Sequence, residues 1–220
     1  MTGGIDLPDV PRWLEAHGIA ADPACWRERV GDGVALGHDR ARLIVVTGEA
    51  DAAAVTALAD VRPEHALLVA IERADLAAAT RRAHERAILH TLPDPDALPD
   101  DLGAEPLAEL PPLEEPLAAE LAWALPRGPI WAVWLEGAPV SFAYAPWRSA
   151  AWFDVSVDTL PGARQLGLGA IAAAAMIRGE RASGREPVWG ANESNAASLR
   201  LASRLGFTPA DELWVCAPRS

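Results

Sequence analysis

The distribution of apolar and polar residues divides the second half of the chain into short strand-like and helix-like segments. Residues 130–135 and 139–145 are largely apolar, and the turn residues between them predict a β-hairpin. Residues 151–157 alternate between polar and apolar side chains, as a half-buried strand does. The next segments predict a helix at 171–178, a strand at 187–191 and a helix at 196–204. This mixture of elements predicts an α/β (α+β) fold with a mixed sheet.

The first half of the chain shows the same mixture of strand and helix patterns. It predicts helices at 9–17, 50–60 and 74–84 and strands at 31–36, 42–46, 66–71 and 86–92. Residues 93–101 are rich in proline and aspartate, which predicts a linker because proline removes amide donors and the acids are solvated. A helix is expected at 114–125. We therefore expect two domains, residues 1–104 and 105–220.

The segment between the strand at 151–157 and the helix at 171–178 has the composition of an anion-binding loop. It reads Arg164-Gln165-Leu166-Gly167-Leu168-Gly169-Ala170. The first amides of a helix have no partner within the helix, and the helix dipole places partial positive charge there. Glycine lets a phosphate approach the backbone closely, and Arg164 adds a permanent positive charge. The segment therefore predicts a site for a phosphate or pyrophosphate group.

The order Arg-x-x-Gly-x-Gly-Ala resembles the pyrophosphate loop of the GNAT N-acetyltransferases. Downstream, a strand, the turn from Asn192 to Asn195, a helix and the terminal Leu205-Gly206-Phe207 follow in the family's order, so the resemblance covers residues 113–215. It implies a GNAT acyl-CoA-binding fold in the C-terminal half. Some GNAT proteins carry a degenerate copy of the fold before the catalytic one. The length and element order of the first half are compatible with such a copy.

The resemblance implies acetyl-CoA as the acyl donor and assigns residues to it. The loop amides are expected to face the pyrophosphate, and the strand backbone is expected to pair with the pantetheine arm. The asparagines have a second explanation, since asparagine also caps helices, and one residue can do both. The expected cofactor contacts are Val155, Val157, Arg164, Gln165, Leu166, Gly167, Leu168, Gly169, Ala170, Asn192, Asn195 and Ser198.

The family's chemistry is direct transfer from the thioester to an amine, which requires a proton acceptor near neutral pH. Asp154 is the first candidate for the general base, because GNAT enzymes often use a carboxylate on this strand; Glu193 and Glu136 are reserves. Many members also carry a tyrosine that protonates the leaving thiolate, but Ala202 stands at that position. The only tyrosine, Tyr144, is the alternative acid if its side chain points into the cleft. A tyrosine at such a position is more often a packing residue of the core.

Composition and charge narrow the choice of partners. The formal net charge of −12 argues against a nucleic-acid partner and is compatible with a cationic amine, although acidity chiefly serves solubility. Neither the histidines nor the two distant cysteines, Cys25 and Cys216, have metal-ligand spacing, so no metal is expected. Reduced cysteines, no evident signal peptide and no long apolar run predict a cytoplasmic protein without a membrane partner.

The sequence thus predicts an N-acetyltransferase that moves an acetyl or other small acyl group from CoA to an amine. The alternative is a non-catalytic acyl-CoA-binding or regulatory protein, which the missing tyrosine supports. A nucleotide-binding domain of another class is a second alternative, but the chain has neither Gly-Lys-Ser/Thr in a P-loop nor Gly-x-Gly-x-x-Gly. The acceptor stays open, and so does a homodimer formed through exposed tryptophans.

Overall fold

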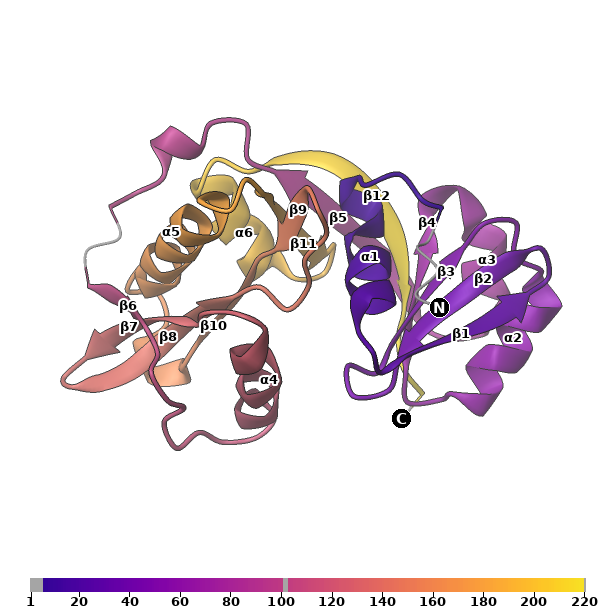
Figure 1. Ribbon diagram of the computed structural model, residues 1–220, viewed down its shortest axis with the longest axis horizontal. Helices are drawn as coiled ribbons and strands as arrows, with labels where there is room; N and C mark the ends of the chain where they lie inside the picture. The colour runs from indigo at the N-terminus through magenta and orange to yellow at the C-terminus, as the bar shows by residue number, and fades with distance from the viewer. Residues whose placement is uncertain (1–5, 101–102, 220) are drawn as a thin grey trace. The chain divides into compact units, whose positions relative to one another are not determined.

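The computed structural model describes residues 6–100 and 103–219, which divide into two compact units (Figure 1). The first unit takes Met1–Leu89, Gly190–Ala196 and Pro209–Ser220, and the second takes His90–Trp189 and Ala197–Thr208. This division differs from the expected single boundary near residue 105. One reason is that the end of the chain returns to the first unit, where Leu213–Cys216 pair with the strand at Ala66–Ala70.

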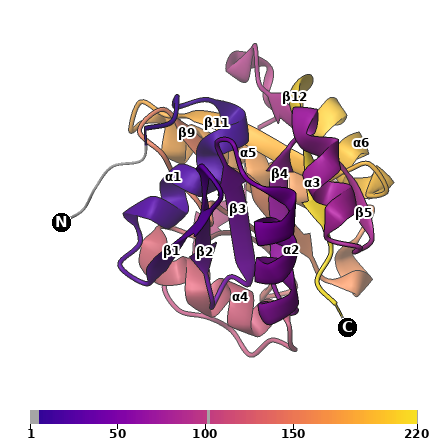
Figure 2. The same cartoon turned by 90° about the vertical axis from the view of Figure 1, so that its right-hand side faces the viewer.

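The first unit is a sheet of strands with helices packed on it (Figure 2). Its strands follow the order β1-β2-β3-β4-β12, in which only the β3–β4 pair is parallel. Apolar side chains of the central strands pack with α2 and α3 into one core. The elements are α1 (Leu14–Ala21), β1 (Cys25–Val30), β2 (Gly33–His38), β3 (Leu43–Thr47), α2 (Ala52–Val61), β4 (Ala66–Ala70), α3 (Ala74–Ala79) and β5 (His84–Thr91), which continues into the second unit.

Two strands of this unit were missed by the hydrophobic pattern, and one helix is shorter than predicted. Strand β1 carries the polar run Arg27-Glu28-Arg29 and is an edge strand, so it lacks an apolar face to detect. Strand β12 (Thr208–Cys216) pairs with β4 through Leu213 to Cys216. Helix α3 ends at Ala79 rather than near residue 84, since Arg81 adopts a left-handed backbone with φ of 55°.

The second unit contains a four-stranded antiparallel sheet in the order β10-β8-β7-β6. The predicted hairpin is confirmed, and Glu136 and Gly137 both have the positive φ that a tight hairpin turn requires. Helix α5 packs against β7, β8 and β10 through a buried run of alanines. The elements are β6 (Ala104–Pro106), α4 (Leu117–Ala124), β7 (Trp131–Leu135), β8 (Ala138–Tyr144), β9 (Trp152–Asp154), β10 (Ser156–Thr159), α5 (Leu168–Arg181), β11 (Glu186–Asn192) and α6 (Ala196–Arg204).

The strand predicted at residues 151–157 is two strands that separate at Val155. Strand β9 pairs in parallel with β11, whereas β10 pairs antiparallel with β8 in the other sheet. The Val155 amide donates to the carbonyl of Val188 at 2.9 Å, which holds the chain at the point where it changes sheets. From β10 the chain passes through a short 3-10 turn, Pro161–Ala163, into residues 164–170 and the start of α5.

Candidate functional site

The start of α5 presents backbone amides that the helix itself does not use. Gly167 is the residue before the helix and has a left-handed backbone, with φ of 82°. The Ala170 amide donates to the Gly167 carbonyl at 3.0 Å, whereas the amides of Leu168 and Gly169 meet no acceptor in the described chain. Free donors at the positive end of a helix dipole form a site for an anion.

An open pocket of about 1000 Å³ adjoins this helix start, and it lies wholly within the second unit. Three arginines line it, Arg164, Arg200 and Arg204, and no carboxylate is among its lining residues in the described chain. The Arg164 Nε donates to the Thr159 carbonyl at 3.0 Å, which positions the guanidinium and leaves its other donors for a ligand. The pocket is therefore locally positive in a protein whose net charge is −12.

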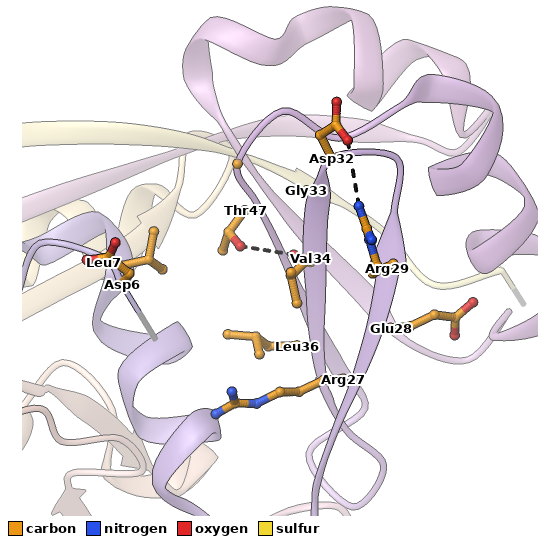
Figure 3. A pocket seen from close by; sticks show the side chains of 11 residues that line it. Asp6, Leu7, Arg27, Glu28, Arg29, Asp32, Gly33, Val34, Leu36 and Thr47 are labelled. Atoms are coloured by element: carbon orange, nitrogen blue, oxygen red, sulfur yellow. Dashed lines mark hydrogen bonds and ion pairs between the residues drawn. The ribbon is translucent and has the colours of Figure 1, made fainter. Parts of the chain in front are cut away.

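A second pocket, of about 430 Å³, lies along the β1–β2 hairpin of the first unit (Figure 3). Its charges are mixed, since Arg27 and Arg29 line it together with Glu28 and Asp32. Arg29 and Asp32 form an exposed ion pair at 3.7 Å. No start of an α-helix contributes to its lining. Of these two pockets, only the one in the second unit combines free helix amides with an excess of positive charge.

Asp154 ends β9, next to the point where the two sheets separate. The pKa of Asp154 is raised to about 7, chiefly by desolvation and to a smaller extent by the negative charge of Glu120, while hydrogen bonds with the Val155 backbone and the Ser156 side chain oppose this shift. The residue as a whole is half-buried. A carboxyl group that titrates near neutral pH can both accept and release a proton there.

Tyr144 is a residue of the core, with only 1% of its surface exposed. Its hydroxyl lies 2.6 Å from Glu120 Oε1 and 2.9 Å from Asp158 Oδ2. Burial and the two neighbouring carboxylates raise the pKa of Tyr144 far above its usual range. A phenol in this state is a poor acid for a leaving thiolate, because the proton is more stable on the phenol.

Comparison with known proteins agrees with this geometry. Residues 131–216 match the family model of GNAT acetyltransferases. This part of the chain is a GNAT acetyltransferase domain. A comparison with curated proteins finds no match.

Solved structures extend the likeness over nearly the whole chain. A GNAT-family acetyltransferase from Novosphingobium aromaticivorans is 19% identical, with a TM-score of 0.61 over 96% of this chain and 98% of that one. A GCN5-related N-acetyltransferase-like protein from Streptococcus suis is 16% identical, with a TM-score of 0.66 over 97% and 94%. A tandem GNAT protein from the clavulanic acid biosynthesis pathway is 16% identical, with a TM-score of 0.53 over 95% and 94%. The predicted mixed α/β GNAT fold is confirmed.

Within the GNAT domain, the structure places the remaining predicted contacts outside the pocket lining. The Asn192 side chain donates to Glu85 at 2.8 Å, and the Asn195 amide donates to the Asn192 carbonyl at 2.8 Å. The Ser198 hydroxyl accepts a hydrogen bond from the indole of Trp189 at 2.8 Å. A cofactor role for these three residues stays a prediction, and the same holds for Val155 and Val157, with the Val155 amide already bonded to Val188.

Three polar residues of α6 that line the pocket were not predicted from the sequence: Arg200, Ser203 and Arg204. Their spacing places them on one face of a helix, which is the signal that could have revealed them. Ala202, at the position where many family members have a tyrosine, is fully buried. A tyrosine at position 202 would therefore have to displace core side chains before its phenol could reach the pocket.

The described residues contain neither a metal-ligand cluster nor a membrane-spanning helix. No group of three or more histidine, cysteine, aspartate or glutamate side chains is arranged to hold a metal ion. Among the helices described, none is long and apolar enough to cross a bilayer.

Proposed function

We propose that the protein transfers an acyl group, with acetyl as the first candidate, from acyl-CoA to an amine. The observation that carries this proposal is the pocket at the start of α5, where free amides of Leu168 and Gly169 adjoin three arginines. A pyrophosphate needs several donors and a positive field, and this pocket offers both. The GNAT domain at residues 131–216 supports the same ligand class.

Asp154 is the proposed general base. The amine nitrogen attacks the thioester carbonyl, the C–N bond forms, the proton passes to an Asp154 oxygen, and the C–S bond breaks to release the CoA thiolate. The raised pKa of Asp154, about 7, makes it a stronger base than an ordinary aspartate while it is still ionised in part at neutral pH. The thiolate is a tolerable leaving group without an acid, since its pKa is ~8.5.

No acyl-enzyme is needed for this route, and the cysteines do not favour one. Burial raises the pKa of both Cys25 and Cys216, which keeps each thiol protonated and weakly nucleophilic. Cys216 is fully buried in the first unit, as part of its hydrophobic core. We therefore propose direct transfer.

A non-catalytic acyl-CoA-binding protein is the second candidate. It is favoured by the buried Ala202 at the position of the family's tyrosine and by the commitment of the Tyr144 hydroxyl to carboxylates. Such a protein would keep the pocket and its affinity for acyl-CoA but would not turn over amines.

The test is calorimetric titration of acetyl-CoA into wild type, Arg164→Glu, Arg204→Glu and a control, Arg40→Glu. Arg40 is exposed on the first unit, so its variant changes the net charge equally without touching the pocket. We expect affinity to fall about tenfold or more in the first two variants, because a charge-assisted contact becomes a repulsion, and to be unchanged in the control.

Release of CoA thiol with a panel of amines is then measured on the same proteins. Binding with turnover supports the acyltransferase, and binding without turnover of any amine supports the non-catalytic candidate. Absence of acetyl-CoA binding at millimolar concentration, or tighter binding of ATP or NAD, would overturn both.

A further inference from the structure

The three arginines that line the pocket at the start of α5 do not occupy equivalent positions. Arg164 precedes the helix, and its Nε is held by the Thr159 carbonyl, whereas Arg204 ends α6. A Cβ placed at Gly167 would lie 3.9 Å from Arg204 Nη2, so this guanidinium reaches the residue that precedes the free amides of α5. Arg164 and Arg204 therefore both belong to the part of the pocket that surrounds the helix start.

Arg200 lines the same pocket one helical turn before Arg204. Four residues of α-helix rise by about 6 Å, so the backbone of Arg200 lies about that far along α6 from the arginine that reaches the loop. Ala197 lines the pocket on the same face of α6, three residues earlier, and its small side chain leaves room beside Arg200. The pocket thus has a second positive position, displaced along α6 from the helix start.

Packing of Leu201 against the start of α5 fixes this displacement. A Cβ placed at Gly169 would lie 3.5 Å from Leu201 Cδ2, so α6 is in close contact with the first turn of α5 at this glycine. Arg200 is the neighbour of Leu201 in the helix, and its backbone is therefore held at a constant distance from the free amides. A ligand that spans both positions meets a preformed arrangement of charges.

Neither Arg200 nor Arg204 is engaged by another group of the protein. Both side chains are exposed, and neither forms a hydrogen bond or an ion pair within the described part of the chain. By contrast, Arg148 in the same unit is paired with Glu180. A guanidinium without a partner in the protein keeps all of its N–H donors for a ligand.

CoA carries its negative charge in two places. One is the pyrophosphate, and the other is the 3′-phosphate of the ribose, a phosphomonoester with a charge of about −1.5 to −2 at pH 7. The ribose separates the two groups, so a pyrophosphate on the amides of Leu168 and Gly169 leaves the 3′-phosphate away from the helix start. Arg200 offers a cation at such a displaced position, and a guanidinium binds phosphate through two parallel N–H donors.

We propose that Arg200 binds the 3′-phosphate of CoA and makes the protein selective for acyl-CoA over acyl-dephospho-CoA. This inference rests on the proposed function, since it assigns parts of the same donor to parts of the same pocket. The 3′-phosphate is remote from the thioester and takes no part in the bond changes, so the contact contributes to donor binding. Arg200 is thus a specificity-determining residue, whereas Arg164 and Arg204 serve any donor that has a pyrophosphate.

The test is calorimetric titration of acetyl-CoA and of acetyl-dephospho-CoA, which differ only in the 3′-phosphate. Each donor is titrated into wild type, Arg200→Gln, Arg204→Gln and the control Arg40→Gln. All three arginines are exposed, so each variant should keep the thermal unfolding temperature of wild type. Arg40 lies in the first unit, so its variant removes the same charge without touching the pocket.

We expect wild type to bind acetyl-CoA about tenfold more tightly than acetyl-dephospho-CoA. In Arg200→Gln this difference should disappear, because affinity for acetyl-CoA falls about tenfold while affinity for acetyl-dephospho-CoA stays within about twofold of wild type. Arg204→Gln should weaken both donors by about the same factor, because the pyrophosphate is common to them. Arg40→Gln should leave both affinities unchanged.

Equal affinity of wild type for the two donors overturns the inference. An equal loss of both affinities in Arg200→Gln also overturns it, since Arg200 would then contact the adenine or the pyrophosphate. Loss of selectivity in Arg204→Gln instead of Arg200→Gln overturns the assignment of the 3′-phosphate to Arg200. Failure of wild type to bind either donor overturns the proposed function itself, and this outcome is distinct because the inference concerns a difference between two measurable affinities.

Discussion

The indole N–H of Trp189 on β11 donates a hydrogen bond of 2.8 Å to the hydroxyl of Ser198 on α6. Trp189 also packs edge-to-face on Phe207, with 5.4 Å between ring centroids, just after α6 ends. These contacts set the rotation of α6 about its own axis. Because a helix turns by about 100° per residue, Arg200, Ser203 and Arg204 lie on roughly the opposite face from Ser198 and line the pocket.

Replacing Ser198 should therefore affect stability and not ligand affinity. In Ser198→Ala the Trp189 indole loses its acceptor, and we expect the free energy of unfolding to fall by about 1 kcal/mol, with acetyl-CoA affinity within about twofold of wild type. Ser203→Ala is the matched control on the pocket face, where affinity should fall and stability should hold. Urea unfolding and calorimetry measure both. A large loss of affinity in Ser198→Ala would show instead that Ser198 contacts the cofactor.

The left-handed backbone conformation at position 167 requires a glycine there. A Cβ at this position would meet no close atom, but φ of 82° is strained for any other residue. We expect Gly167→Ala to lower the free energy of unfolding by about 1–2 kcal/mol and to weaken acetyl-CoA binding, since the relaxed loop re-aims the amides of Leu168 and Gly169. Gly162→Ala, in open space before the same loop and without a positive φ, should change neither quantity in thermal unfolding and binding assays.

Asp154 should couple both activity and stability to pH. Its folded-state pKa of about 7 lies above the ordinary value of 3.8, so the native state binds more protons than the unfolded state between these values. The contribution of Asp154 to the free energy of unfolding is therefore largest at low pH, and it is lost as the pH rises from 3.8 through about 7. We expect Asp154→Asn to be more stable than wild type at pH 8, by on the order of 1–2 kcal/mol after allowance for partial exposure, and no more stable at pH 4.

The activity of the same variant gives an independent measurement. Wild-type kcat/KM should rise with pH through about 7, as Asp154 ionises. Asp154→Asn should lose this limb and lower kcat/KM by about 10²-fold, which is typical for removal of a general base. A variant that keeps the wild-type profile would exclude Asp154 as the base.

Arg148 and Glu180 form the buried ion pair that ties the segment before β9 to α5. Arg148 Nε lies 3.0 Å from Glu180 Oε2, and Arg148 also donates to the Ala145 carbonyl at 2.7 Å. Their side chains are 17% and 7% exposed. We expect Arg148→Met to cost about 3–5 kcal/mol in urea unfolding, because it leaves Glu180 buried without a partner. Arg29→Met breaks the exposed ion pair with Asp32 and should lower the free energy of unfolding by less than about 1 kcal/mol. An equal loss of stability in the two variants would contradict the expectation that the buried pair contributes more than the exposed one.

The sequence by itself determined the features that depend on local order along the chain. The hairpin at Glu136-Gly137, the helix at Ala196–Arg204 and the glycine-containing loop before α5 all follow from residue spacing and backbone preference. These features need no knowledge of distant residues, because a positive φ, an apolar period or a free helix amide is a property of a few neighbouring residues.

Only the tertiary structure decided which residues meet across the fold. The break at Val155 follows from pairing with two different sheets, and the polar edge strand β1 exists because β2 pairs with it. The contact of Tyr144 with Glu120 joins residues that lie 24 positions apart, and the arginines of α6 reach the loop because Trp189 sets that helix's rotation. Such contacts depend on packing between elements, for which the order of residues along the chain carries no local signal.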